Sequence, residues 1–205
     1  LIKPAMKKYL SLILLLCGFA GSVKAQLYAE VAFLQTTGNF GYVFKPGPMF
    51  SIGYRFAEDQ FDQFPLTVYV SYYSLNARKD TFPVVGYSSE LPMIRPGYKV
   101  YEDHKGWILG LGYQYRFLDT DFSPFATLDA TLRSENYNLD SYYYGIMESS
   151  DYVSRFYVGL IPKAGISYGT DEYTLDLGLG YSMNLTRGGK AYYWQTALGM
   201  TYYFE

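Results

Sequence analysis

The chain has one histidine, His104, and this residue is the first candidate for catalysis. Glu102 and Asp103 stand next to it. A histidine that is oriented by a carboxylate and held within reach of a serine can act as the general base in hydrolysis. His104 falls at the end of a long polar connection, where a solvated loop residue is the simpler expectation. A hydrolase or acyltransferase remains the alternative, and we predict that the protein is not an enzyme.

Metal binding has little support in the sequence. One histidine and one cysteine, Cys17, do not make a zinc cluster. Five acids in the connections offer oxygen ligands for calcium but lack the regular spacing of a dedicated loop: Asp103, Glu135, Asp140, Glu148 and Asp151. We predict no metal site and no cofactor. The net charge of -2 argues against a nucleic-acid partner.

Seven other charged side chains are notable because each lies in a segment of alternating polarity. They are Glu30, Arg55, Arg116, Asp129, Arg133, Lys163 and Asp176. Their neighbours on the same face are mainly glycine, serine and threonine. If this face is buried, its charges must be paired. We therefore predict a structural network of salt bridges and water, with a gate or proton path as the alternative.

The elements that carry these charges are predicted to be β-strands. In residues 173–185 every second residue is large and apolar, as in Leu175, Leu177 and Leu179. Successive side chains of a strand point to opposite faces, so this segment has one apolar face and one small, polar face. The 25 tyrosines and 14 phenylalanines also favour strands. We predict eight strands, at about 27–35, 50–56, 66–73, 107–117, 125–135, 152–168, 173–185 and 193–204.

The connections between these strands alternate in length. Compact turns are expected at 57–65, 118–124 and 169–172, and long loops at 36–49, 76–105 and 134–151; a tight glycine turn follows at 186–190. Short turns at one end and long loops at the other are typical of outer-membrane barrels, whose short end is periplasmic. Both ends of the barrel domain then lie on the periplasmic side.

The first 25 residues have the pattern of a signal peptide. Lys7 and Lys8 form the positive region, an apolar stretch follows at 10–20, and Ala25 ends a small-residue cleavage site. Leu1 to Ala5 precede Met6, the more natural start. Cys17 is then lost on cleavage, although a lipoprotein acylation site is the alternative. The predicted domains are a signal peptide at 1–25 and a β-barrel at 26–205.

The polar faces decide which side of the barrel meets lipid. A solvated surface is normally rich in lysine and glutamate, whereas these faces hold small residues and isolated charges. We therefore expect lipid on the apolar side and a lumen filled by side chains, as in other eight-stranded barrels. In this lumen Asp129, Lys163 and Asp176 are predicted at similar depth, and Glu30 beside Arg55.

At this level the chain resembles the small outer-membrane β-barrels of the OmpA/OmpX-like superfamily. The resemblance covers residues 27–204 and rests on architecture. Its sharpest feature is the end of the last strand, where Gly199, Tyr202 and Phe204 are similar to the signal read by the barrel assembly machinery. It implies an all-β, transmembrane, antiparallel, eight-stranded up-and-down barrel in the outer membrane of a Gram-negative bacterium. Some such barrels modify lipid A, but the deacylases among them have a serine two residues after their histidine, where this chain has Gly106.

The long loops are the predicted functional surface. Residues 136–144 are rich in tyrosine and asparagine, residues that make adaptable contacts in binding loops, and we expect Asn136, Tyr137, Tyr142, Tyr143 and Tyr144 to form a contact surface. The expected partners are outer-membrane lipid, the assembly machinery during biogenesis, and a surface ligand or another outer-membrane protein. An accessory subunit that docks through its wall is the alternative, and a lipid A-modifying enzyme is a third.

Overall fold

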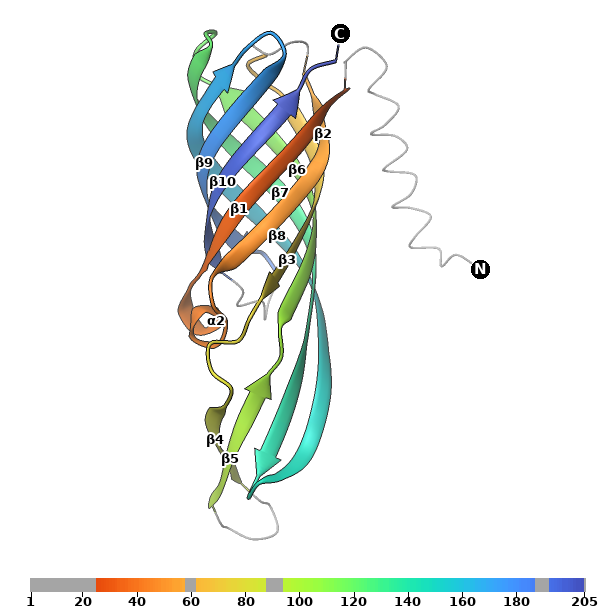
Figure 1. The fold of residues 1–205 in the computed structure, drawn as a ribbon, viewed down its shortest axis with the longest axis vertical. Coiled ribbons are helices and arrows are strands. Elements are labelled where there is room, and N and C mark those ends of the chain that lie inside the picture. Colours follow the sequence, from red (N-terminus) through yellow and green to blue (C-terminus); the bar gives the residue numbers. More distant parts are fainter. Residues whose placement is uncertain (1–24, 58–61, 88–93, 187–191, 205) are drawn as a thin grey trace, which may run out of the picture.

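The computed structural model describes residues 25–57, 62–87, 94–186 and 192–204. Within these residues eight antiparallel strands close a barrel (Figure 1), and the additional pairing of β7 with β8 closes the circuit. The prediction of an eight-stranded barrel is thus confirmed. The strands are β1 (Ala25–Thr36), β2 (Gly47–Phe56), β3 (Leu66–Leu75), β6 (His104–Arg116), β7 (Phe122–Tyr143), β8 (Ile146–Gly169), β9 (Tyr173–Asn184) and β10 (Tyr193–Tyr202).

Each strand of the barrel has a buried and an exposed face. In β1 buried and exposed residues alternate along the whole strand, and β10 shows the same alternation. Pairing keeps like faces together: Val31 lies opposite Leu198, and both are more than half exposed. The register is fixed because a slip by one residue would move every apolar side chain into the lumen.

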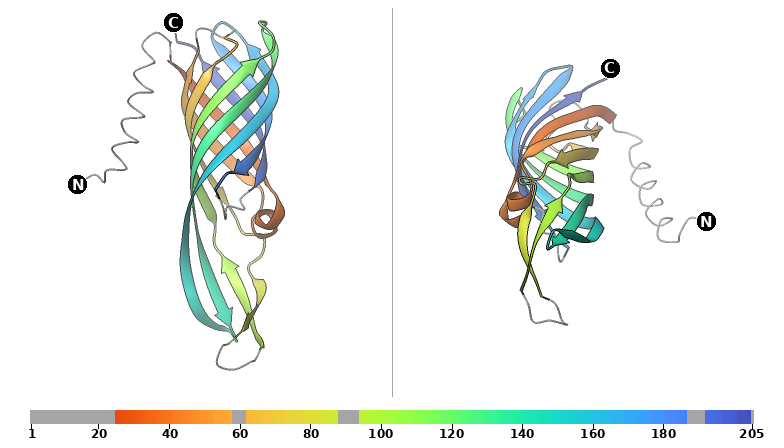
Figure 2. Two further views of the ribbon diagram at one scale, coloured as in Figure 1. Left: turned by 180° about the vertical axis from the view of Figure 1, so that it is seen from behind. Right: turned by 60° about the horizontal axis from the view of Figure 1, so that its bottom comes forward.

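The two ends of the barrel differ as the sequence predicts. The first residues of β1 and the last of β10 lie at the end that carries the short turns, and the long connections lie at the opposite end (Figures 1 and 2). The predicted signal peptide lies outside the described residues, except for Ala25, and so does most of the predicted turn at 186–190.

The long connections are more regular than predicted. The first contains the helix α2 (Gly38–Val43), and the second contains the hairpin β4 (Phe82–Tyr87) and β5 (Ile94–Tyr101). The third is not a loop at all, because β7 and β8 stay paired as far as Tyr143 and Ile146. β5 pairs with the outer part of β7. Beyond the lipid the chain therefore satisfies its backbone hydrogen bonds in a four-stranded extension of the barrel sheet.

We call this extension the arm; it consists of β4, β5 and residues 136–156. Figure 2 shows it extending past the end of the barrel, with β7 and β8 running into it without a break. Eight residues beyond Glu135 correspond to about 26 Å at the rise of a β-strand. Tyr144 and Gly145 form its tip, with φ angles of 53° and 79°. Two successive positive φ values characterise the type I′ turn of a two-residue hairpin. The sequence Tyr-Gly is not one of the pairs that predict this turn.

Candidate functional sites in the lumen and above the membrane

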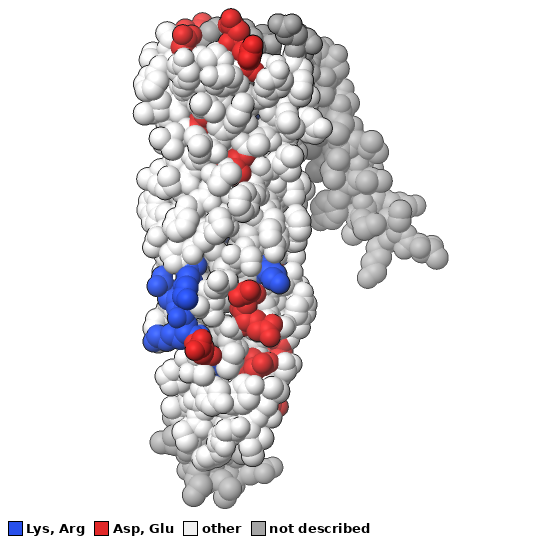
Figure 3. All heavy atoms as spheres, viewed as in Figure 1, with Lys and Arg blue, Asp and Glu red and all other residues white. Residues whose placement is uncertain are grey.

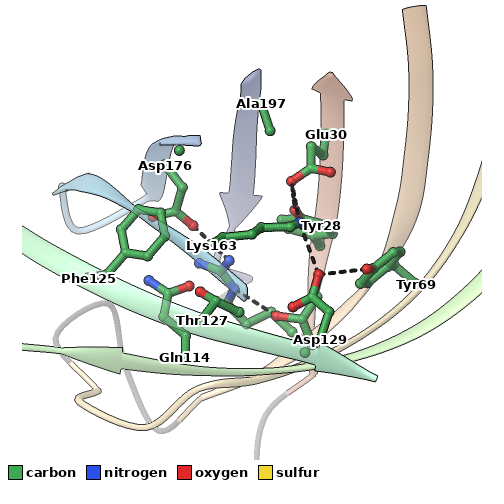
Figure 4. Close-up of a pocket in the computed structure, with 14 residues that line it drawn as sticks. Tyr28, Glu30, Tyr69, Gln114, Phe125, Thr127, Asp129, Lys163, Asp176 and Ala197 are labelled. Carbon is green, nitrogen blue, oxygen red and sulfur yellow. Dashed lines mark hydrogen bonds and ion pairs between the residues drawn. The ribbon is translucent and has the colours of Figure 1, made fainter. Parts of the chain in front are cut away.

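The half of the lumen nearer the short turns holds the ammonium group of Lys163 between two carboxylates. Lys163 Nζ lies 3.0 Å from Asp129 Oδ2 and 3.2 Å from Glu30 Oε2 (Figure 4). The hydroxyl of Tyr69 donates to Asp129 at 2.6 Å, and that of Tyr28 donates to Glu30 at 2.7 Å. Lys163 of β8 thus contacts Asp129 on the neighbouring strand β7, and it reaches across the lumen to Glu30 of β1, a strand with which β8 does not pair. These contacts connect opposite sides of the barrel through its interior.

A separate ion pair lies in the same layer. Arg55 Nη2 is 2.7 Å from Asp176 Oδ2, and Arg55 Nε donates to Thr67 at 3.2 Å. Asp129, Lys163 and Asp176 line one cavity, as their predicted similar depth requires, and Asp129 pairs with Lys163. Glu30, predicted beside Arg55, instead pairs with Lys163, and Arg55 pairs with Asp176. Because the lumen is narrow, long side chains extend across it. A charged residue can therefore pair with one at the same depth on a strand that is not its neighbour.

Two arginines complete the predicted set of lumen charges. Arg116 is buried near the short turns, where its Nη2 donates to the carbonyl of Thr120 at 3.2 Å. Arg133 is fully buried in the half of the lumen nearer the long connections, where it contacts Ser182 and the ring of Tyr193. The structure therefore does not bring all seven charges into one cluster.

Glycines on the inward faces make room for these large side chains. A Cβ atom on Gly110 would overlap the ring of Tyr69, and one on Gly112 would lie 2.5 Å from Asp129 Oδ1. The cavity that remains in this layer is about 30 Å³, room for about two water molecules. The half of the lumen nearer the short turns is therefore filled rather than open.

An aromatic cluster surrounds His104 at the extracellular mouth of the barrel. This residue is 1% exposed, and its ring lies 4.9 Å from the rings of both Phe40 and Phe44. Its Nε2 is 3.4 Å from Glu135 Oε2, and Tyr73 donates to Glu135 Oε1 at 2.9 Å. The prediction of a solvated loop histidine is wrong. His104 instead begins β6 and faces inward, and the segment with α2 folds over it, an arrangement that local sequence does not reveal.

The tyrosine- and asparagine-rich tract lies on the outer part of β7. Tyr137 faces the mouth, with its ring 5.6 Å from that of His104, and burial raises the pKa of its phenol. The ring of Tyr142 stacks on that of Tyr98 of β5, with ring centres 4.8 Å apart. Tyr144, at the tip, is 60% exposed. Asn136 and Tyr143 are half-buried. Of the predicted contact residues, Tyr137 and Tyr142 thus pack against other rings, whereas Tyr144 is exposed.

The outer wall is apolar around the barrel. On the face drawn in Figure 3, charged side chains gather at the end with the short turns and in a belt where the barrel meets the arm, with few charged atoms on the wall between them. Leu177, Leu179 and Ile52 are each more than half exposed there. Aromatic side chains are paired toward the mouth: Tyr72 with Trp107, and Tyr181 with Trp194. An apolar band with interfacial aromatics is the signature of a lipid-facing barrel. Among the described residues no helix has the length and hydropathy needed to cross a membrane.

Solved structures provide the comparison that decides the fold. Neisserial surface protein A is 17% identical over 88% of this chain and 97% of its own, with a TM-score of 0.54. A major outer-membrane protein of Thermus thermophilus is 10% identical over 88% of this chain and all of its own, with a TM-score of 0.51. The N-terminal β-barrel domain of Pseudomonas aeruginosa OprF is 12% identical over 89% of this chain and 99% of its own, with a TM-score of 0.50.

This chain has the fold of the small outer-membrane β-barrels. No protein-family model matches it, and no curated protein matches it in sequence. The chain therefore shares the architecture of the OmpA/OmpX-like barrels, although its sequence identity to these solved structures is low. With its lipid-facing wall, this fold places the protein in a Gram-negative outer membrane, as predicted.

The last strand of this outer-membrane barrel presents the residues of the predicted assembly signal in different ways. Gly199 faces the lumen, where a Cβ would lie 3.2 Å from the ring of Tyr28. Tyr202 and Phe204 are about half exposed on the wall, with ring centres 5.1 Å apart. Gly199 thus leaves space for the Tyr28 ring in the lumen, and the two aromatic side chains are accessible from the membrane.

Proposed function

We propose that the protein is a non-enzymatic surface-contact protein, in which the arm binds an extracellular protein partner. The observation that carries this proposal is a free strand edge. Among the described residues, 146–156 of β8 pair with β7 only, since pairing with β9 begins at Gly159. An unpaired edge presents backbone donors and acceptors to which an extended segment of another protein can add.

The side chains of the arm fit the same function. Ile146, Tyr152 and Phe156 on the edge strand are 63–70% exposed. Exposed tyrosines and large apolar groups supply contact area at low cost in conformational entropy. The stacked pair Tyr98 and Tyr142 ties β5 to β7 and stiffens the sheet behind the edge. A rigid edge loses less conformational entropy on binding than a mobile loop.

Removing the outer arm should abolish partner binding and leave the barrel intact. Asn138 lies opposite Tyr152, so residues 139–151 can be replaced by Asn-Gly, which closes a two-residue hairpin. We expect the variant to keep heat-modifiable gel mobility, because the barrel contacts are untouched. Co-purification of an extracellular partner with the tagged protein in mild detergent should be lost.

A matched control changes the arm without shortening it. Tyr152→Ser with Ile146→Ser keeps the strands and removes two exposed side chains, and we expect weakened rather than abolished binding. If a partner still co-purifies with the shortened arm, the outer β7–β8 hairpin is not required for docking, which leaves the wall as the main candidate surface. That result would favour an accessory subunit of a larger outer-membrane complex.

The environment of His104 supports a structural role rather than catalysis. His104→Ala removes the ring that packs between Phe40 and Phe44 and leaves Glu135 with Tyr73 as its remaining partner. We expect the free energy of unfolding to fall by about 1–3 kcal/mol, as for other buried polar deletions. The mass spectrum of lipid A from cells that produce this variant should match that of the wild type. A lipid A change that depends on His104 would instead indicate an enzyme.

We also infer how the chain reaches the membrane. Residues 1–25 direct export as a signal peptide, and the barrel assembly machinery reads Gly199, Tyr202 and Phe204. The exposure of the two aromatics toward lipid supports this role, because a signal must be accessible while the last strand is being joined to β1.

A further inference from the structure

Exposed cations gather on one sector of the outer surface, where the barrel meets the arm. We call Lys45, Arg78, Lys79 and Lys105 the basic row, and all four side chains are exposed. Lys45 lies just before β2, Lys105 is on β6, and the other two follow the end of β3. These three strands are adjacent in the sheet. In the view of Figures 1 and 3 the larger group of basic side chains lies beside α2.

Backbone pairing holds the members of the basic row close together. The amide of Lys45 donates to the carbonyl of Asn76 at 2.8 Å, and the amide of Arg78 donates to the last carbonyl of α2 at 2.7 Å. The guanidinium of Arg78 also donates to a carbonyl of α2. The ammonium group of Lys79 lies 5.2 Å from the centre of the Tyr42 ring. The segment after β3 is thus fixed against α2, and its cations stay on the surface.

The basic row begins directly above the lipid-facing wall. Trp107 and Tyr72 form an aromatic pair on this sector, and such pairs mark the boundary between hydrocarbon and water. Lys105 stands two residues further out on the same face of β6, about 7 Å along the strand, and lies opposite Ser74. The headgroup layer of a bilayer is about 5–7 Å thick on each side of the hydrocarbon. Lys105 is therefore level with the headgroups, and Lys45 lies just beyond it.

The charges of the basic row are not neutralised by salt bridges within the described ranges of the chain. Two exposed acids are near in sequence: Asp80 directly follows Lys79, and Asp103 lies two residues before the cation of β6. Glu102 is on the arm, where it accepts a hydrogen bond from Asn138 of β7. Most acidic side chains of the belt lie apart from the larger basic group in Figure 3. This sector therefore keeps an excess of positive charge.

We propose that the basic row binds phosphate groups of the outer-leaflet lipid in the membrane that holds the barrel. Lysine and arginine are the usual ligands of phosphate in proteins. The row continues the lipid-facing wall without a gap, so lipid headgroups are present beside it wherever the barrel is embedded. The occupant is thus selected by charge complementarity and by its place at the edge of the lipid contact. This inference does not depend on the protein partner proposed for the arm.

Native mass spectrometry of the protein in mild detergent tests the site, with diphosphoryl lipid A as the probe. Lys45→Gln with Lys105→Gln removes two cations whose side chains make no salt bridge in the described structure. A basic residue near an anionic lipid surface contributes roughly fivefold in affinity, so we expect binding to weaken about thirtyfold. Lys99→Gln with Arg155→Gln, the same changes at two cations of the arm, should keep the wild-type affinity.

Two further measurements separate lipid phosphate from other ligands. Lipid A without its phosphates should bind the wild type as weakly as diphosphoryl lipid A binds the double variant. Equal affinity of wild type and double variant for diphosphoryl lipid A overturns the proposal. If the double variant instead loses only the binding of a soluble polyanion such as dextran sulfate, the ligand is soluble, and the proposal is wrong. Heat-modifiable gel mobility confirms folding, and if the double variant does not fold, Lys105→Gln alone should weaken lipid binding about fivefold.

Discussion

Lys163→Met is expected to lower the free energy of unfolding by about 3–5 kcal/mol, the usual cost of removing one partner from a buried ion pair. Lys163 Nζ lies 3.0 Å from Asp129 Oδ2 and 3.2 Å from Glu30 Oε2, so it is the shared cation of both carboxylates. Without it, two buried carboxylates face the same cavity with hydrogen bonds from Tyr69 and Tyr28 as their main support. Urea unfolding in detergent, followed by tryptophan fluorescence, measures the loss.

The neutral triple variant is the matched control for this change. Lys163→Met combined with Glu30→Gln and Asp129→Asn removes all three charges together, and buried ion pairs replaced in this way often cost little. We expect most of the stability to return. Asp129→Ala alone should destabilise less than Lys163→Met, because Glu30 still pairs with the lysine. An unchanged urea midpoint for Lys163→Met would show that the layer is hydrated well enough to tolerate unpaired carboxylates.

Leu177→Arg is expected to cost about 2–4 kcal/mol, the penalty measured for arginine at the midplane of lipid-facing barrel walls. Leu177 lies in the middle of β9 and is 55% exposed. Its partners across the sheet are Ile166 of β8 and Leu198 of β10, both also exposed on the wall. Urea unfolding in lipid vesicles is the appropriate measurement, because the penalty depends on the bilayer.

Leu185→Arg is the control for depth. Leu185 is 60% exposed and follows β9 at the extracellular end, where the cost should be only about 0–1 kcal/mol. A soluble barrel would tolerate both changes, since surface substitutions usually stay within about 0.5 kcal/mol. Equal and small effects at Leu177 and Leu185 would therefore contradict the assignment of this face to lipid.

The sequence by itself determined the barrel and the orientation of its wall. Alternation in segments such as residues 173–185 predicts strands because the side-chain period of a strand is two, and this period depends only on the backbone. The small residues opposite the apolar face indicate a filled lumen, since space beside Tyr69 exists only where Gly110 lacks a side chain. Both properties are local, so they can be read along the chain.

Contacts between distant segments were decided by the tertiary structure alone. Lys163 meets Glu30 across the lumen because depth in a tilted, closed sheet depends on the register of all eight strands. His104 is buried only because α2 and its neighbours fold over the mouth. Residues 136–144 form a strand rather than a loop because β5 and β8 pair with them on either side. The residue pattern of one strand does not show which side chain of a distant segment will contact it. That contact decides whether a buried charge is paired and whether a histidine is buried.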